Sequence, residues 1–304
     1  MPLSKAEQVE SAEIVRSSSW IGWLPILVLP IAAIACRNLF SAWAFMWILS
    51  FAIFIGLKWL TWWKARGVVE HPTWRSTAYL LAWPGMDAEA FLDVEHQVLP
   101  PPARTWVRAS LETALGAVLL WVVARSVPQR EALLRGWIGM VGLILLLHFG
   151  TFQIVSLVWQ SIGVKAVPIM MAPLRAVALS EFWGRRWNLG FRLLAHELIF
   201  RPLYRKVGAG LAGFLVFVAS GLIHDLVISL PARGGYGLPT GYFVLQGVGI
   251  TMERSTLGKR IGLGGGRIGR LFMALFVAGP VFWLFHPWFV LRVMLPFMHA
   301  IHAL

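Results

Sequence analysis

Long apolar segments recur along this chain, and they constrain its fold more than any other feature. A helix needs about 20 apolar residues to cross the hydrocarbon core of a bilayer. Hydrophobic residues make up 58% of the chain and charged residues only 13%, unlike the balance of a soluble domain. We therefore predict an all-α polytopic membrane protein with about eight transmembrane helices. The expected spans are 20–36, 39–57, 109–123, 136–157, 207–230, 238–252, 271–285 and 287–303.

The chain shows no internal repeat and no linker, so residues 1–304 are expected to form a single membrane-embedded domain. The first 19 residues are polar, and no small-residue cleavage site follows the first apolar run. This run is therefore predicted to be a retained span and not a signal peptide. The single cysteine, Cys36, excludes an internal disulfide and a cysteine metal site.

Positive charge is distributed unevenly between the loops. A net charge of +13 would favour nucleic-acid binding in a soluble protein, but in a membrane protein it marks the cytoplasmic loops. Loops 58–108, 158–206 and 253–270 hold 19 of the 27 Lys and Arg residues. These loops and the N-terminus are predicted to face the cytoplasm, and no nucleic-acid partner is expected. The excess of 21 Arg over 6 Lys indicates a GC-rich bacterial genome, and hence a bacterial inner membrane.

Two segments between the spans are expected to lie at or dip into the membrane. Residues 189–204 alternate apolar and polar positions at helical spacing, which predicts a helix in the interface. Pro168 and Pro173 would break any helix through 162–180. A re-entrant excursion is predicted there, because irregular backbone is tolerated at membrane depth where protein buries it.

Two polar residues in apolar surroundings are the candidates for chemistry. His224 lies in the apolar run 207–230, where an ionisable group is costly and usually functional. A neutral imidazole there can accept a proton, although a histidine hydrogen-bonded between helices is an equally weighted alternative. Asn188 can polarise a carbonyl or orient a hydroxyl, or it can cap the helix 189–204.

Other motifs give weaker evidence of a chemical function. His196-Glu197 begins like a zinc-protease signature, but position 200 is Phe, so no metal site is expected. The glycine-rich stretch 264–269 follows no strand and is interpreted as a flexible loop. No GxSxG elbow occurs, which favours direct attack by a substrate hydroxyl over a covalent acyl-enzyme. Asp225 is about 100° round the helix from His224, so the two side chains should not touch.

Arg185 and Arg186 can bind the phosphates of an acyl carrier. Lipid headgroup binding and the charge bias of cytoplasmic loops are alternatives for both. His148 is a second imidazole in an apolar span, and it is interpreted as a packing or relay residue.

Two motifs together resemble a known family. The block Ser180–Leu189 reads SEFWGRRWNL, and Ser220–Asp225 reads SGLIHD. Both are similar to the wax synthase branch of the membrane-bound O-acyltransferases, in which Glu is more usual at the position of Asp225. Leu81–Asp87, LAWPGMD, also resembles a segment of bacterial members.

The resemblance implies a multi-helix membrane fold around an internal chamber, and acyl transfer from acyl-CoA to a hydroxyl. The histidine of the family maps to His224, and the Asn or His of its first motif to Asn188. We therefore expect a wax ester synthase-like enzyme that acylates a lipophilic, hydroxylated acceptor among membrane lipids. Acyl-CoA would be a co-substrate, with no permanently bound cofactor or metal. The expected contacts of the CoA phosphates are Arg185, Arg186 and Lys206.

Two alternatives stay open. Within the same chemistry, the acceptor is the hydroxyl of a sugar, a peptide or a secondary metabolite. In a different class, the chain is a transporter that moves protons or ions along His148, His224 and Asp225. The absence of an inverted repeat speaks against the transporter.

Overall fold

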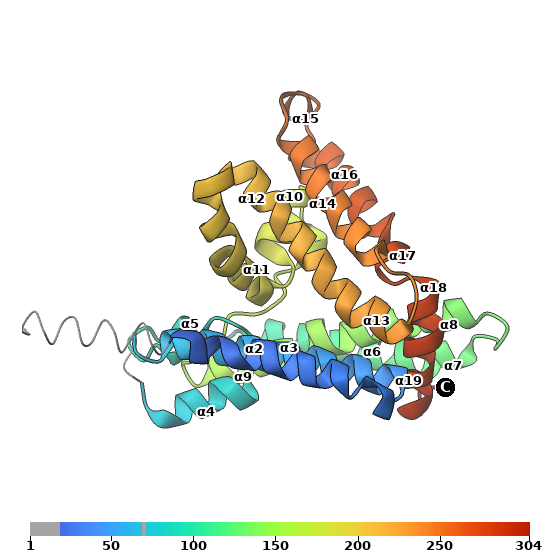
Figure 1. Ribbon diagram of the computed structural model, residues 1–304, viewed down its shortest axis with the longest axis horizontal. Coiled ribbons are helices and arrows are strands. Elements are labelled where there is room, and N and C mark those ends of the chain that lie inside the picture. The colour runs from blue at the N-terminus through green and yellow to red at the C-terminus, as the bar shows by residue number, and fades with distance from the viewer. Residues whose placement is uncertain (1–18, 69–70) are drawn as a thin grey trace, which may run out of the picture.

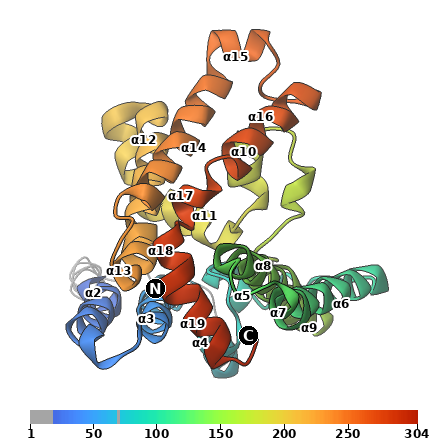
Figure 2. The same ribbon diagram turned by 90° about the vertical axis from the view of Figure 1, so that its right-hand side faces the viewer.

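A computed structural model describes residues 19–68 and 71–304, and every regular element in these residues is a helix. Figures 1 and 2 show a lower layer of two helical hairpins, above which a second group of helices rises. The lower layer contains α2 (Ser19–Ala35), α3 (Ala42–Ala65), α4 (Thr73–Ala82), α5 (Ala88–Leu92), α6 (Ala103–Val118), α7 (Ala124–Ser126), α8 (Ala132–Ile144) and α9 (Phe152–Ser161). The upper group contains α10 (Leu179–Glu181), α11 (Leu189–Ala195), α12 (Arg201–His224), α13 (Leu230–Ala232), α14 (Leu238–Arg254), α15 (Thr256–Arg260), α16 (Gly266–Ala278) and α17 (Val281–Leu284). The last helices, α18 (Pro287–Phe289) and α19 (Leu295–Ala300), return to the lower layer.

Five continuous helices in the described residues are long and apolar enough to cross a membrane, which makes this a multi-pass membrane protein. Each overlaps one of the eight expected spans and is longer than that span. They run over Ala42–Ala65, Ala103–Ser126, Ala132–Ser161, Leu189–Ala232 and Gly266–Leu284.

The other three expected spans are also helical, but their described parts are shorter than these five helices. The helix Trp20–Ala35 is apolar and contains two prolines. Residues 287–300 form a helix of 14 residues, about 21 Å long against a hydrocarbon core of about 30 Å. The segment 238–252 belongs to α14, which has 17 residues and ends in Glu253-Arg254. Of the eight expected transmembrane helices, five are thus supported by the length and composition of the described helices, and the other three stay predictions.

The longest helix bends sharply at one glycine. Residues 189–207 are helical, as the amphipathic pattern predicted. At Gly208 the backbone adopts φ 79° and ψ 168°, which glycine reaches without the steric penalty of a Cβ. Beyond this bend α12 continues to His224, so the two arms form the arch that Figure 1 shows at α11 and α12.

The segment before this helix is irregular, as Pro168 and Pro173 predicted. Residues 162–178 contain no α-helix and only one short 3-10 turn. Their backbone instead pairs with the chain that follows η5, the π-turn Phe182–Arg186. The N–H of Met171 donates to the carbonyl of Arg186 at 2.8 Å, and the N–H of Leu189 donates to the carbonyl of Ile169 at 2.9 Å.

Helix α14 is anchored at its N-terminus by the carboxylate of Asp225. One carboxylate oxygen accepts the N–H of Gly237 at 2.9 Å, and the other accepts the N–H of Thr240 at 3.1 Å. The hydroxyls of Thr240 and Ser229 donate to the same carboxylate. Negative charge at a helix N-terminus is stabilising, and it satisfies amides that lack a partner within the helix. Asp225 therefore has a structural role in this fold and, as predicted, does not hydrogen-bond to the ring of His224.

Three more side chains fix α14 along its length. Tyr242 donates its hydroxyl to the carbonyl of Val277 at 3.1 Å, and the amide of Gln246 donates to the carbonyl of Phe276 at 2.7 Å. At the far end, buried Glu253 accepts the N–H groups of Leu179 and Ser180 at 2.6 and 3.2 Å. Glu253 thus caps the helical segment that continues into η5.

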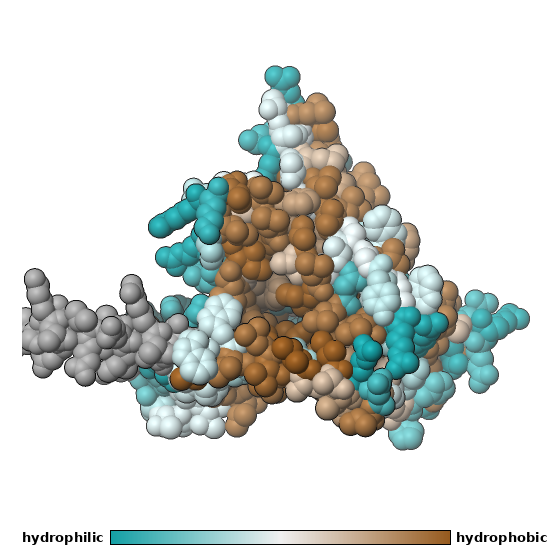
Figure 3. Space-filling model, in the orientation of Figure 1, coloured by the Kyte–Doolittle hydropathy of each residue, from teal (hydrophilic) through white to brown (hydrophobic). Residues whose placement is uncertain are grey.

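The surface over the upper helices is largely apolar, and it is hollowed between the arch and the lower layer (Figure 3). Large apolar side chains such as Leu222 on α12 and Val248 on α14 are exposed. Such a face is stable in contact with lipid and unstable in water.

We expect Asp225→Ala to destabilise the protein by about 1–3 kcal/mol, because it removes a helix cap and takes away the acceptor of the Thr240 hydroxyl. The measurement is thermal unfolding of purified protein in detergent. Asp225→Asn, which keeps an acceptor oxygen, should fall between the wild type and Asp225→Ala. An unchanged unfolding temperature for Asp225→Ala would remove the capping role.

The positive charge of α15 predicts the orientation of the upper helices. Arg254 at the end of α14 is exposed, as are Lys259 and Arg260 of α15, and positive loops stay in the cytoplasm. In a Cys36-free background, Arg260→Cys should react with an impermeant maleimide only after the cells are permeabilised. Labelling of position 260 in intact cells would show that the upper helices have the opposite orientation.

Candidate active site

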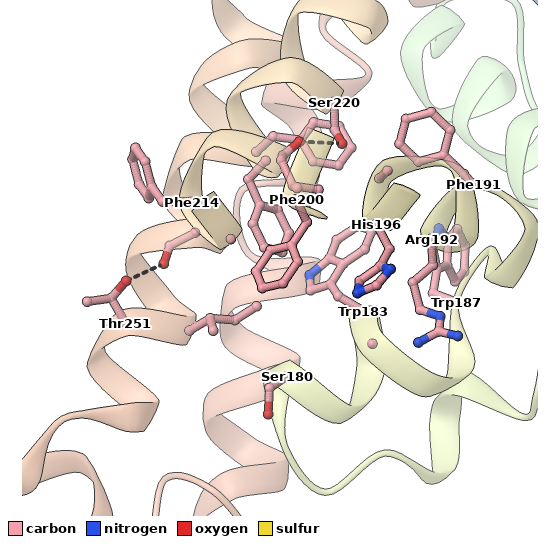
Figure 4. A pocket seen from close by; sticks show the side chains of 18 of the residues that line it. Ser180, Trp183, Trp187, Phe191, Arg192, His196, Phe200, Phe214, Ser220 and Thr251 are labelled. Carbon is pink, nitrogen blue, oxygen red and sulfur yellow. Dashed lines mark hydrogen bonds between the residues drawn. The ribbon is translucent and has the colours of Figure 1, made fainter. Parts of the chain in front are cut away.

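A cavity of about 650 Å³ lies between α11, α12, α14 and η5 (Figure 4). Its walls are mostly aromatic and aliphatic, with a small number of polar groups, as in most binding sites for organic ligands. The apolar and glycine positions that line it are Trp183, Gly184, Trp187, Phe191, Ala195, Phe200, Gly210, Gly213, Phe214, Val216, Phe217, Phe243, Gly247 and Ile250. The polar residues are Ser180, Asn188, Arg192, His196, Ser220, His224, Thr251, Arg254 and Ser255.

His224 and Asn188, 36 residues apart in the sequence, both line this cavity. Nδ1 of His224 lies 2.7 Å from the carbonyl oxygen of Ser220. Because a carbonyl can only accept, Nδ1 carries the proton and Nε2 of a neutral ring is free to accept one. The ring also packs on Phe243, with centroids 4.4 Å apart. The imidazole is therefore held in one orientation and one tautomer.

The residues around His224 explain the motif SGLIHD. Ser220 supplies the carbonyl that orients the imidazole, and Asp225 caps α14. At Gly221 a Cβ would lie 2.7 Å from the Cα of Thr240, so only glycine allows α12 and α14 to approach this closely. The motif thus places one imidazole in the wall and fixes the helix opposite it.

Asn188 has the capping role that the sequence offered as one of two alternatives, and its geometry leaves room for the other. Its backbone is left-handed, with φ 43°, a conformation that Asn adopts more easily than most residues. Its Oδ1 accepts the N–H of Phe191 at 3.3 Å and so caps α11. Among the described residues, Nδ2 makes no hydrogen bond. The cap therefore uses the oxygen of the amide and leaves the nitrogen free to donate.

The three cations expected to hold the CoA phosphates do not line the cavity. Arg185 and Lys206 are exposed outside it. Arg186 is engaged with Glu181 at 2.6 Å and with the carbonyls of Met171 and Ala172. The N–H of Val177 and this arginine together hold the pKa of Glu181 below its ordinary value. Arg186 thus stabilises the loop that carries the motif.

Other basic residues line the cavity instead. Arg192 and His196 lie next to each other on the wall formed by α11 and its extension (Figure 4). Arg254, at the end of α14, also lines the cavity and forms no ion pair with any described residue. The first two were visible in the sequence as the polar face of helix 189–204, one turn apart. Arg254 gave no comparable signal, because the sequence assigned it to a loop.

No group of three potential ligands that could hold a metal ion occurs in the described part of the chain. His148 does not line the cavity; its ring packs against Phe152 in a π-helical stretch of the span Ala132–Ser161. Its Nδ1 is buried without a hydrogen-bond partner among the residues described. His148 and Asp225 therefore do not share a lined path with His224.

Sequence comparison gives independent information on this region. Residues 166–245 match the membrane bound O-acyl transferase family. "Probable long-chain-alcohol O-fatty-acyltransferase 3" of Arabidopsis thaliana is 30% identical over 148 residues, which cover 43% of this chain and 42% of the relative. "Long-chain-alcohol O-fatty-acyltransferase" of Simmondsia chinensis is 31% identical over 103 residues, 31% of this chain and 29% of the relative. "Acyl-CoA--sterol O-acyltransferase 1" of Arabidopsis thaliana is 34% identical over 73 residues, 22% and 21% respectively.

The matched region of this chain spans less than half the length of these relatives. The family match nevertheless covers the π-turn η5, the arch and the start of α14, which together form most of the cavity wall. The resemblance seen in the two motifs is thereby confirmed. Residues 166–245, which carry both Asn188 and His224, are similar in sequence to the membrane bound O-acyl transferase family.

Proposed function

We propose that this protein transfers an acyl group from acyl-CoA to the hydroxyl of a lipophilic acceptor, in the manner of a wax ester synthase. The observation that carries the proposal is the meeting of His224 and Asn188 in one apolar cavity. A base and a hydrogen-bond donor at a shared site are the groups that acyl transfer to a hydroxyl requires. The names of the plant relatives add support for a long-chain alcohol as the acceptor.

The reaction proceeds by direct attack. Nε2 of His224 accepts the hydroxyl proton as the acceptor oxygen bonds to the thioester carbon. The Nδ2 group of Asn188 donates to the carbonyl oxygen as negative charge develops there. When the carbon–sulfur bond breaks, the thiolate of CoA takes the proton from the imidazolium. The ester and the free thiol leave, and His224 returns to its neutral state.

The cavity has a polar end that fits the carrier. Along α14, Arg254 lies 11 residues beyond Phe243, which packs on His224, an axial distance of about 16 Å. Thr251 and Ser255 line the cavity near this arginine. We place the CoA phosphates near Arg254 and Arg192, with the flexible arm running from there to His224. Arg185 and Lys206 stay predicted contacts for the part of CoA that extends outside the cavity.

The walls favour a lipophilic acceptor over a sugar or a peptide. Around His224 the lining residues are Phe217, Phe243 and Trp183, which offer little hydrogen bonding to a polyol. A proton or ion path through His148, His224 and Asp225 has no support from the geometry, since only His224 lines the cavity.

His224→Ala is expected to lower ester formation by at least about 10²-fold, because a positioned base contributes about 10²–10⁴-fold. The assay uses purified, monodisperse protein with radiolabelled acyl-CoA and a long-chain alcohol. His148→Ala serves as the matched control and should retain most of the activity. An active His224→Ala beside an inactive His148→Ala would move the reaction centre to the span Ala132–Ser161.

Asn188→Asp separates the two roles of Asn188. Aspartate keeps the capping oxygen and tolerates the left-handed backbone, so the unfolding temperature should not fall. It lacks the N–H donor and places a carboxylate near developing negative charge, so turnover should fall by about 10²–10³-fold. Retained turnover at an unchanged unfolding temperature would leave Asn188 as a cap only.

A further inference from the structure

A buried lysine lies in the first long span, outside the cavity. Lys58 of α3 is 2% exposed, and the sequence had assigned it to a cytoplasmic loop. Its Nζ donates to the carbonyl oxygen of Gly85 and lies 3.3 Å from the ring centroid of Tyr79. It forms no salt bridge with any residue that the structure describes. An ionisable group within a membrane span indicates a function until another reason for it is found.

The energetics make simple packing a poor reason for this lysine. Burying an amine that has no counter-ion costs free energy, whereas methionine would fill a similar volume at no such cost. The contacts that offset this cost are one carbonyl and one aromatic face. Compared with a methionine, the lysine therefore adds a directional hydrogen bond to the backbone carbonyl of Gly85.

The loop of residues 83–87, whose Gly85 carbonyl accepts from Lys58, lies against the start of α11, close to Asn188. Trp83, two residues before Gly85, is buried and stacks on Phe91, and this contact also holds the loop in place. Met86, which follows Gly85, reaches α11. Its backbone nitrogen lies 3.3 Å from the place where a Cβ on Gly190 would be. Gly190 is buried and follows Asn188 by two residues.

We propose that Lys58 is a positioning residue for acyl transfer. Through Gly85 and Met86 it holds the start of α11 in place, and this fixes Asn188 in its left-handed conformation at the cavity wall. The inference rests on the proposed role of Asn188. It also gives a use to the segment LAWPGMD, whose glycine and methionine form the two contacts in this chain.

The test is a double-mutant cycle on the full-length protein with Lys58→Met and Asn188→Ala. Lys58→Met alone should lower kcat by about 10–100-fold, since small misplacements of a reacting group have effects of this size. The KM for acyl-CoA should stay within about twofold, because the carrier contacts are elsewhere. In the Asn188→Ala background, Lys58→Met should change kcat by less than about twofold, because the side chain that the lysine positions is then missing; independent sites would instead show the same loss in both backgrounds.

A matched control is Tyr79→Phe. It keeps the ring beneath Lys58 and removes only the hydroxyl, which lies 2.7 Å from that of Thr61. This variant should retain the wild-type kcat. Thermal unfolding of all variants shows whether each is folded under the assay conditions.

The outcomes separate this inference from the function itself. If Asn188→Ala and His224→Ala both keep wild-type turnover, the proposed function fails and the positioning role fails with it. If those two are impaired but folded Lys58→Met keeps its kcat, the positioning role alone is wrong. An effect of Lys58→Met that is equally large with and without Asn188 also overturns it, because the lysine then acts on something else.

Discussion

Buried and partly buried hydrogen bonds along α14 hold the upper half of this protein together. Asp225 caps the beginning of the helix, Gln246 fixes its middle, and Glu253 near its end caps the segment that leads into the FWGRRW block. Such bonds are strong where water is scarce, and an unsatisfied partner there is costly. One short helix therefore sets the distance between the two motifs of the family, because each motif is tied to a different end of it.

The arch completes the cavity from this scaffold. Gly208 turns the long helix so that its first arm carries Asn188 and its second arm carries His224. Each of the two side chains is then oriented by a local hydrogen bond that leaves one nitrogen free: Nδ2 of Asn188 and Nε2 of His224. The proposed reaction needs one hydrogen-bond donor and one proton acceptor. These two nitrogens can serve as that pair, while Oδ1 of Asn188 and Nδ1 of His224 form hydrogen bonds within the fold.

Charged residues show most clearly where reasoning from the sequence stops. Hydropathy identified five long helices but ended α3 before Lys58, because a lysine in sequence has no visible partner. Arg186 had the residue type and position of a phosphate ligand, yet Glu181 and two carbonyls engage it. Arg254, assigned to a loop, instead lines the cavity. In each case the role depends on a partner far away in the chain, and residue type and spacing do not contain that information.

The sequence by itself determined the class of the protein and the segment that resembles the family, and it singled out the two residues that we propose for the chemistry. These follow from local properties: apolar length, proline and glycine positions, and an imidazole and an amide within recognisable motifs. Only the tertiary structure decided that Asn188 and His224 share a cavity, that Asp225 is a cap, and which cations lie near the site. The physical reason is that α14 brings these groups together through contacts between residues dozens of positions apart, and such contacts exist only once the chain is folded.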